Sequence, residues 1–157
     1  MTVQEITPTV DTDALLAGAQ FADAFRAEIA DPALDARHAA ERMMAHQPRW
    51  AEALVKVRNV LVAPLGLKTS GEGAPAPRGM IGIFPVLSET PERLIAGFND
   101  SHLDFRVVVD VATTGTARSV TLTTLVKTHN WFGRTYLAII MPFHRLIAPA
   151  LLRQVAG

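Results

Sequence analysis

Residues 131–156 read WFGRTYLAIIMPFHRLIAPALLRQVA, an apolar segment long enough to form one helix across a whole sheet. At about 100° per residue, Pro142 and Pro149 share one arc with the arginines of this segment. Because a proline-kinked helix bends away from its proline side, the helix is expected to curve over the core with both prolines outward. The alternative extends the preceding strand to Ile140 and begins a helix at Pro142. The apolar arc predicted to face the core comprises Tyr136, Ile140, Phe143, Ile147 and Leu151.

The segments before this helix predict an antiparallel meander and two helices. Turn-type clusters separate four β segments, at 80–87, 92–98, 103–112 and 118–128. An earlier strand is expected at 20–29, followed by a helix at 32–46, where Asp31 and Pro32 are typical helix-start residues. A second helix is expected from Pro48 to near Pro64, and a flexible loop at 66–79. Helices and strands segregated in this way indicate an α+β fold.

Composition limits the classes of protein that remain. The chain has 157 residues, 15 Lys+Arg against 15 Asp+Glu, 49% hydrophobic residues and no cysteine. This length fits a single domain spanning 1–157. Zero net charge argues against nucleic-acid binding, and the lack of cysteine excludes disulfides and thiolate metal sites. We expect a cytoplasmic protein with no membrane span, because the N-terminus lacks a signal pattern and polar residues interrupt the apolar stretch 136–152.

Several stretches resemble a known family. They are FADAF (21–25), PRWAEALVKVRNVLVAPLGLK (48–68), NDSHLDFR (99–106) and HNWFGRTYLAIIMPFHRLI (129–147). With the element order, they resemble a bacterial group known as domain of unknown function 2867, within the START/polyketide-cyclase-like (SRPBCC) superfamily. The resemblance implies the helix-grip fold, in which a curved antiparallel sheet wraps around a long C-terminal helix, with two short helices after the first strand. It also implies a hydrophobic cavity between sheet and helix, but no activity.

Three polar residues interrupt apolar faces, where charge is costly. In the strand 20–29, Asp23 shares a face with two phenylalanines. Arg58 lies about 60° from the apolar centre of the second helix, and His144 about 60° from that of the terminal helix. All three are therefore expected to face one interior. As structural groups, Asp23 and Arg58 would form a buried ion pair, or each would lie at the sheet rim and reach water, and His144 would bond a backbone carbonyl. As a ligand site, the three would join Tyr136 in orienting the polar end of an apolar molecule.

A second polar cluster lies on the opposite face of the strand 103–112. Its members are His102, Asp104, Arg106 and Asp110. We interpret this cluster as a solvated sheet face or a contact within a homodimer, in preference to a catalytic His/Asp pair. His38 and Glu41 lack a second ligand pair, so no metal is expected. No phosphate- or dinucleotide-binding fingerprint is present, so no cofactor is expected either.

Three functions stay open on these residues. The favoured one is a binding module that holds a small hydrophobic molecule between the sheet and the C-terminal helix. The second is an enzyme of the cyclase or isomerase type acting on a polyketide-like or other apolar substrate, with His144 or Asp23 as general base and Arg58 stabilising an enolate. It requires two of these groups to converge within hydrogen-bond reach. The third is a structural or assembly protein with a filled core.

Overall fold

The computed structural model describes residues 3–45, 80–81, 84–99, 103–114 and 117–155. The helix expected from Pro48 and the loop expected at 66–79 lie outside these ranges. The elements are β1 (Gln4–Ile6), α1 (Thr12–Leu15), β2 (Phe21–Ile29), α2 (Ala36–Ala45), β3 (Met80–Ile81), β4 (Phe84–Glu89), β5 (Arg93–Asn99), β6 (Leu103–Thr114), β7 (Ala117–Thr128) and α4 (Trp131–Arg153).

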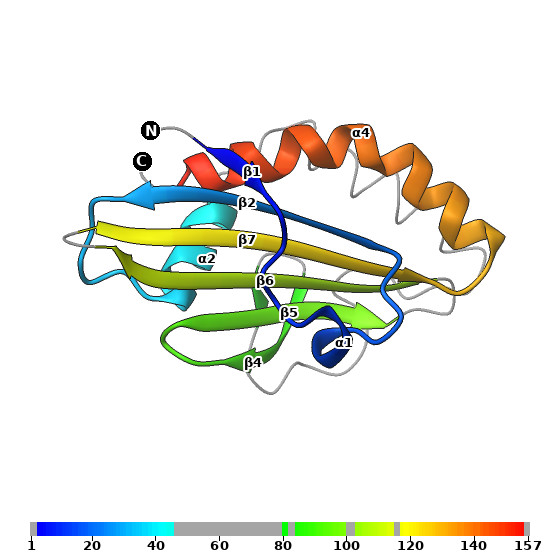
Figure 1. Ribbon diagram of the computed structural model, residues 1–157, viewed down its shortest axis with the longest axis horizontal. Coiled ribbons are helices and arrows are strands. Elements are labelled where there is room, and N and C mark those ends of the chain that lie inside the picture. Colours follow the sequence, from blue (N-terminus) through cyan, green and yellow to red (C-terminus); the bar gives the residue numbers. More distant parts are fainter. Residues whose placement is uncertain (1–2, 46–79, 82–83, 100–102, 115–116, 156–157) are drawn as a thin grey trace.

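The strands form one antiparallel sheet of seven strands, in the order β1-β2-β7-β6-β5-β4-β3 (Figure 1). The fold is α+β, as predicted, with helices α2 and α4 on one side of a curved sheet. The strand expected at 20–29 and the antiparallel meander are confirmed, but the single strand expected at 80–87 is wrong, because β3 and β4 are two strands that pair with each other. The meander closes by pairing its last strand, β7, with β2 along the full length of β2. The strand β1, a three-residue edge strand that pairs with β2, was not predicted.

Helix α2 begins four residues later than predicted. Asp31 and Pro32 form a separate turn, in which the Leu34 N–H donates to the Asp31 carbonyl. Asp35 then caps the helix, because its carboxylate accepts the His38 N–H at 2.8 Å. The prediction therefore chose the wrong one of two aspartates that both resemble caps.

Helix α4 is a single element from Trp131 to Arg153, so the alternative that carries the preceding strand to Ile140 is wrong. Asn130 caps it through a bond from the Gly133 N–H at 3.0 Å. The parts before and after Ile140 meet at 56°. Pro142 explains the bend, since it lacks an N–H and its ring collides with the preceding turn. Pro142 is exposed, as predicted for the convex side.

The core-facing side of α4 differs from the predicted arc. Phe143 was expected inside but its exposed fraction is 41%, whereas Ala148 and Leu152 are buried at 2% and 0%. The face in contact with the sheet is therefore rotated by about a quarter turn from the predicted one. The small Ala148 lets α4 approach β2 and β7 closely, and the large residues of the neighbouring arc remain outside.

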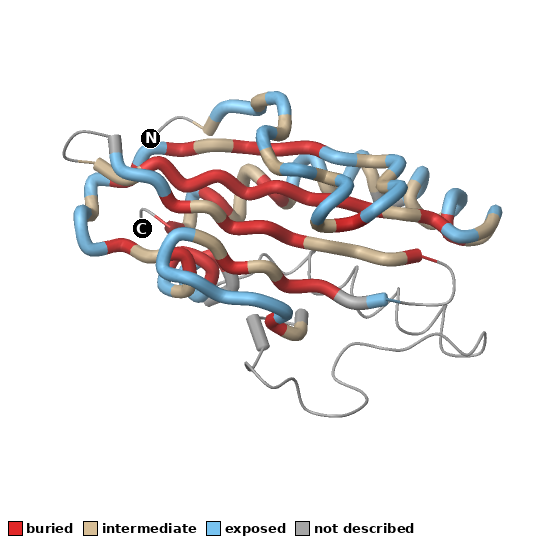
Figure 2. The backbone as a smooth tube through the Cα atoms, turned by 60° about the horizontal axis from the view of Figure 1, so that its bottom comes forward, coloured by how far each residue is buried: buried red, intermediate tan, exposed pale blue. Residues whose placement is uncertain are grey.

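Both faces of the central strands are buried (Figure 2). We call the face under α2 and α4 the inner face, and the opposite one the outer face. On the inner face Phe25, Leu122 and Val109 lie in one cross-strand row and join the core cluster. On the outer face Ala24, Val108, Thr123 and Leu125 are each 0% exposed.

The N-terminal segment explains why the outer face is not solvated as expected. After β1 the chain crosses this face to reach α1 (Figure 1). The helix α1 has Asp11 as its N-cap and is followed by the buried Leu16. A Cβ at Gly18 would lie 3.4 Å from Lys127 Cε, which places this segment against β7.

Candidate functional site

Asp23 is placed by the alternation of β2, which turns every second side chain toward the inner face. Its cross-strand partner on β7 is Thr124, 2% exposed, and Val107 follows on β6. Phe25 is buried two residues further along the strand. A carboxylate, 8% exposed, therefore lies in an otherwise largely apolar part of the sheet.

His144 reaches this carboxylate from α4. Its Nε2 lies 3.0 Å from one carboxylate oxygen of Asp23 and 3.2 Å from the other. The imidazole is 16% exposed, and its ring stands edge-on to Phe21 with centroids 6.0 Å apart. An ionised carboxylate only accepts, so Nε2 carries the donated proton and Nδ1 is the acceptor in the neutral ring. The pair joins the C-terminal helix to the second strand at the inner face.

The structure thus brings two of the four candidate residues together. The hydrogen-bond partner of His144 is a carboxylate instead of the backbone carbonyl considered in the structural interpretation. Arg58, the partner considered for Asp23, lies outside the described residues. Tyr136 is half-buried near the start of α4, two turns before His144.

A second His–Asp pair lies at the end of the β6–β7 hairpin and was missed. His129 Nε2 is 3.0 Å from Asp104 Oδ1, with side chains 33% and 15% exposed. The histidine predicted to lie near Asp104 was His102, which lies outside the described residues. The signal was in the hairpin register: Asp104 pairs with Lys127, so residue 129 is its diagonal neighbour.

The other members of the predicted polar cluster are also half-buried and bonded. Arg106 Nη1 donates to the Phe105 carbonyl at 2.9 Å, and Asp110 accepts from Arg93 Nε at 2.6 Å. Burial lowers the pKa of Arg106, and the nearby carboxylate of Asp104 partly offsets this effect. These residues are therefore partly exposed and bonded within the chain, and the contact within a homodimer stays a prediction.

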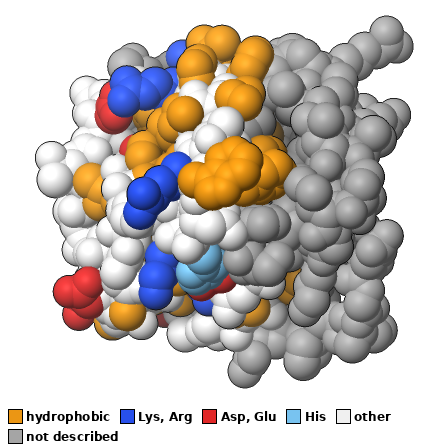
Figure 3. Space-filling model, turned by 90° about the vertical axis from the view of Figure 1, so that its right-hand side faces the viewer, with side chains coloured by type: hydrophobic (Ala, Val, Ile, Leu, Met, Phe, Trp, Pro, Cys, Tyr) orange, Lys and Arg blue, Asp and Glu red, His pale blue; other side chains and the backbone are white. Residues whose placement is uncertain are grey.

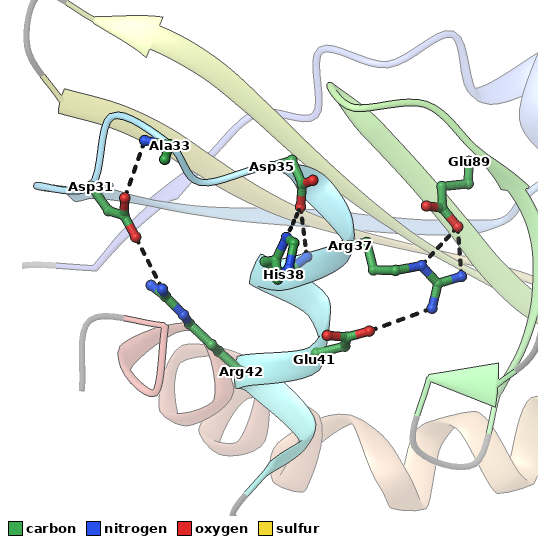
Figure 4. Close-up of polar contacts among 8 residues, drawn as sticks. All are labelled: Asp31, Ala33, Asp35, Arg37, His38, Glu41, Arg42 and Glu89. Atoms are coloured by element: carbon green, nitrogen blue, oxygen red, sulfur yellow. Dashed lines mark hydrogen bonds and ion pairs between the residues drawn. The ribbon is translucent and has the colours of Figure 1, made fainter.

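Polar contacts hold α2 against the rest of the fold (Figure 4). The Asp31 carboxylate accepts from Arg42 at 3.0 Å and from the Ala33 N–H at 3.1 Å. Arg42 also donates to the carbonyl of Val155, just beyond α4, at 3.2 Å. Together these bonds connect the turn before α2 to the C-terminal end of α4, and so hold in place the layer that contains His144.

The same network continues along the exposed side of α2 (Figure 4). His38 donates to Asp35 through its backbone, and its ring Nδ1 lies 2.7 Å from the same carboxylate. Arg37 donates to Glu89 on β4 at 2.9 Å and lies 3.6 Å from Glu41. The bond to Glu89 raises the pKa of Arg37.

These contacts predict how stability depends on pH. The bond from Arg42 lowers the pKa of Asp31, and the bond from the His38 N–H lowers that of Asp35. A carboxyl whose folded-state pKa is depressed stabilises the fold above its unfolded pKa of about 4, and this stability is lost as the pH falls through the folded pKa. Thermal unfolding followed by circular dichroism should therefore show a melting temperature that falls below about pH 4.

Asp35→Asn sharpens this test, since asparagine still caps a helix but carries no charge. We expect a smaller loss of melting temperature between pH 5 and pH 3 in Asp35→Asn than in the native chain. Asp13→Asn, which removes an exposed carboxylate outside this network, serves as the control. An equal acid response in Asp35→Asn and the native chain would contradict the assignment.

The described residues contain neither a cluster suited to a metal ion nor a single helix suited to cross a membrane. No group of three or more His, Asp or Glu side chains in these ranges is arranged to hold a metal ion. No single helix in the same ranges is long and apolar enough to cross a membrane, although the two halves of α4 pass this test together across their bend.

Three solved structures are similar to this chain. Solved structures with a similar arrangement include a protein of Rhodobacter sphaeroides, at 12% identity over 99% of this chain and 95% of that chain, with a TM-score of 0.46. Ms6760 of Mycobacterium smegmatis matches at 10% identity over 86% and 88%, with a TM-score of 0.44. CalU16 of Micromonospora echinospora matches at 13% identity over 85% and 80%, with a TM-score of 0.34.

No curated protein matches the chain. The model of the family described as "Protein of unknown function (DUF2867)" matches residues 15–151, which include both His–Asp pairs and nearly all of the sheet. The chain therefore belongs to the DUF2867 family.

Proposed function

We propose that the chain binds a small, mostly apolar molecule between the inner face of the sheet and α4, with Asp23 and His144 as its polar anchor. We also propose that it is a single START/polyketide-cyclase-like domain spanning 1–157. The observation that carries the binding proposal is the Asp23–His144 pair itself. Its two ionisable side chains lie largely buried where the helix meets the sheet, within an apolar surrounding. Ligand pockets combine apolar walls with a few such convergent polar groups.

The stability of the fold does not by itself explain why the core contains the Asp23–His144 pair. Two apolar side chains of similar volume commonly stabilise a core as well as a buried ion pair does, because the pair must be desolvated. A ligand supplies a different reason. Within the part of the chain that the structure describes, one N–H of His144 lies between both oxygens of Asp23, and this leaves lone pairs of the carboxylate for another donor. The ligand class that fits is an apolar molecule carrying one hydroxyl or similar donor.

Tyr136 and Arg58 are the other two residues of the proposed site. Tyr136, half-buried on α4, offers a phenolic O–H that both donates and accepts. Arg58 would add a fixed positive charge, which suits a carbonyl or carboxylate on the ligand.

An enzyme of the cyclase or isomerase type is the second candidate, and a specific contact favours it. The bond from Nε2 to Asp23 fixes the tautomer of His144 and leaves Nδ1 as a proton acceptor. An aspartate that orients a histidine in this way is a recurrent arrangement in general-base catalysis. The base would take a proton from carbon next to a carbonyl of the apolar substrate.

Native mass spectrometry of the purified chain tests the binding proposal. We expect an apolar adduct, and a melting temperature that rises on addition of at least one hydroxylated hydrophobic compound. His144→Gln and Asp23→Asn should each weaken binding by about tenfold or more, since each leaves a polar group without its partner. His129→Gln, at the other pair, should bind like the native chain.

A native mass without adduct, together with no thermal response to such compounds, would instead support a structural protein with a filled core. Binding that is unchanged in both His144→Gln and Asp23→Asn would remove these residues from the site. Incubating the recovered ligand with the chain in D2O separates binding from catalysis. Deuterium incorporated at carbon by the native chain but not by Asp23→Asn would establish the second candidate.

A further inference from the structure

The side of α4 that faces away from the sheet is mostly apolar. Trp131, Ile139 and Leu146 have exposed fractions of 74%, 62% and 64%, far above those of ordinary core residues. Large apolar side chains gathered in this way on one element indicate an interaction surface. We call the exposed residues of α4 the α4 outer face: Trp131, Arg134, Thr135, Ala138, Ile139, Pro142, Phe143, Arg145, Leu146 and Arg153.

The charge on this face has one sign. Its only charged members are Arg134, Arg145 and Arg153. The asymmetry extends beyond the helix, because residues 111–157 contain five Lys+Arg and no Asp or Glu, while all 15 acidic residues precede them. Figure 3 views the side of the molecule where α4 begins, and it shows hydrophobic and basic side chains next to one another. A partner for this face must therefore be both apolar and anionic.

The shape of the α4 outer face helps to distinguish between possible anionic partners. The bend at Ile140 and the exposed Pro142 make the outer side of α4 convex, and Ile139, Phe143 and Leu146 flank its apex. In Figure 1 the helix lies along one margin of the molecule, where a broad surface can approach it. A convex apolar ridge can insert its side chains into a broad, deformable surface, and arginines beside it can extend their guanidinium groups to phosphate.

A second copy of the chain does not fit this face. A two-fold contact places the same patch on both subunits, so six arginines would be brought into one interface. No carboxylate of the helix is present to neutralise them, since α4 contains no Asp or Glu. Like charges opposed in this way disfavour association.

We propose that the α4 outer face docks on an anionic lipid surface, with Ile139, Phe143 and Leu146 in the acyl–headgroup boundary and the three arginines among the phosphates. Apolar burial and attraction to anionic headgroups act together in this mode of binding, and neither is sufficient alone. The helix lies on the membrane and does not cross it. This proposal is independent of the ligand proposed for the inner face.

Sedimentation with vesicles tests the docking surface. The full chain should bind vesicles of phosphatidylcholine mixed with phosphatidylglycerol, and should not bind phosphatidylcholine alone. Each of Arg134→Gln and Arg145→Gln should weaken binding by about fivefold, and high salt should weaken it further. Ile139→Ser combined with Leu146→Ser should weaken it by about tenfold or more.

A control and a second readout make the result specific. Leu87→Ser removes an exposed leucine of β4, 40% exposed, and should leave vesicle binding unchanged. In a Trp50→Phe background the emission of Trp131 should shift to the blue when anionic vesicles are added. These α4 substitutions change exposed residues, so circular dichroism should show the native fold in all of them.

Three outcomes would overturn the proposal. One is no binding to the anionic vesicles, and another is binding that the α4 substitutions leave unchanged. The third is a concentration-dependent dimer, seen by analytical ultracentrifugation, that Ile139→Ser abolishes. The last result would assign the α4 outer face to self-association instead.

Discussion

Replacing His144 with alanine is expected to lower the free energy of unfolding by about 3 kcal/mol, the usual cost of removing one partner of a buried ion pair. The physical reason is the carboxylate left behind. Asp23 is 8% exposed and lies among apolar side chains, so water cannot readily replace the lost hydrogen bond. The edge contact of the imidazole with Phe21 is lost as well. In a chain of 157 residues this corresponds to a fall in melting temperature of about 6–12 °C.

The second His–Asp pair is a matched control for this effect. His129 and Asp104 are also 3.0 Å apart, but their side chains are 33% and 15% exposed. His129→Ala should therefore cost about 1 kcal/mol or less, as for other exposed pairs. Urea unfolding followed by circular dichroism measures both variants on one scale. Equal losses in His144→Ala and His129→Ala would show that water reaches Asp23 as easily as Asp104.

A double-mutant cycle tests whether the loss belongs to the pair. Removing both charges with Asp23→Asn and His144→Gln should cost less than the sum of the two single changes, because no unpaired carboxylate remains. Additive losses would mean that the two side chains stabilise the fold independently and that the 3.0 Å contact contributes nothing.

Gly97→Ala is expected to destabilise the chain by about 3 kcal/mol or more, through overpacking and backbone strain together. A Cβ at this position would lie 2.1 Å from the carbonyl oxygen of Phe105 on β6. The φ of Gly97 is also +153°, a conformation that residues with a side chain rarely adopt. Because β5 and β6 are hydrogen-bonded here, the strands must separate to admit a methyl group.

Gly18→Ala separates the two causes. Gly18 has a φ of +78°, but an added Cβ would meet only the flexible end of Lys127, at 3.4 Å. Its cost should be about 1 kcal/mol, from backbone strain alone. The difference in unfolding free energy between the two variants then measures the clash at Gly97. A Gly97→Ala chain as stable as Gly18→Ala would show that β5 and β6 adjust at little cost.

Both members of the inner pair were predictable one at a time, but their pairing was not. The alternation of residues 21–29 places Asp23 on a core face, and the 3.6-residue period places His144 near one. Periodicity says nothing about where a helix crosses a sheet, so the contact between residues 23 and 144 follows only from the packing of α4 on β2. The structural interpretation accordingly gave each residue a different partner, and only the enzyme hypothesis required two of the three polar groups to converge.

The differences between the predicted and the observed fold also have local causes. The predicted arc of α4 gave every residue the same 100° step, which does not include the change of direction at the bend, and it placed the largest apolar side chains inside. The structure instead buries the small Ala148 against the sheet and leaves Phe143 outside. The strand β1 has three residues, two of them exposed, so its pattern is too short to recognise. The chain that follows β1 covers the outer face of the sheet. Hydrophobic periodicity does not reveal such a crossing.

The pairing of β2 with β7 has a consequence for synthesis on the ribosome. Phe21 is hydrogen-bonded across the sheet to a strand that contains Val126, so about a hundred residues must be translated between the two. At typical elongation rates this takes about 5–20 s, during which β2 has only the short β1 to pair with. Closing so large a loop is slow compared with forming the local hairpin of β6 and β7. A nascent chain that ends before residue 128 therefore leaves β2 without its full partner strand, and stop codons placed there should yield aggregation-prone fragments.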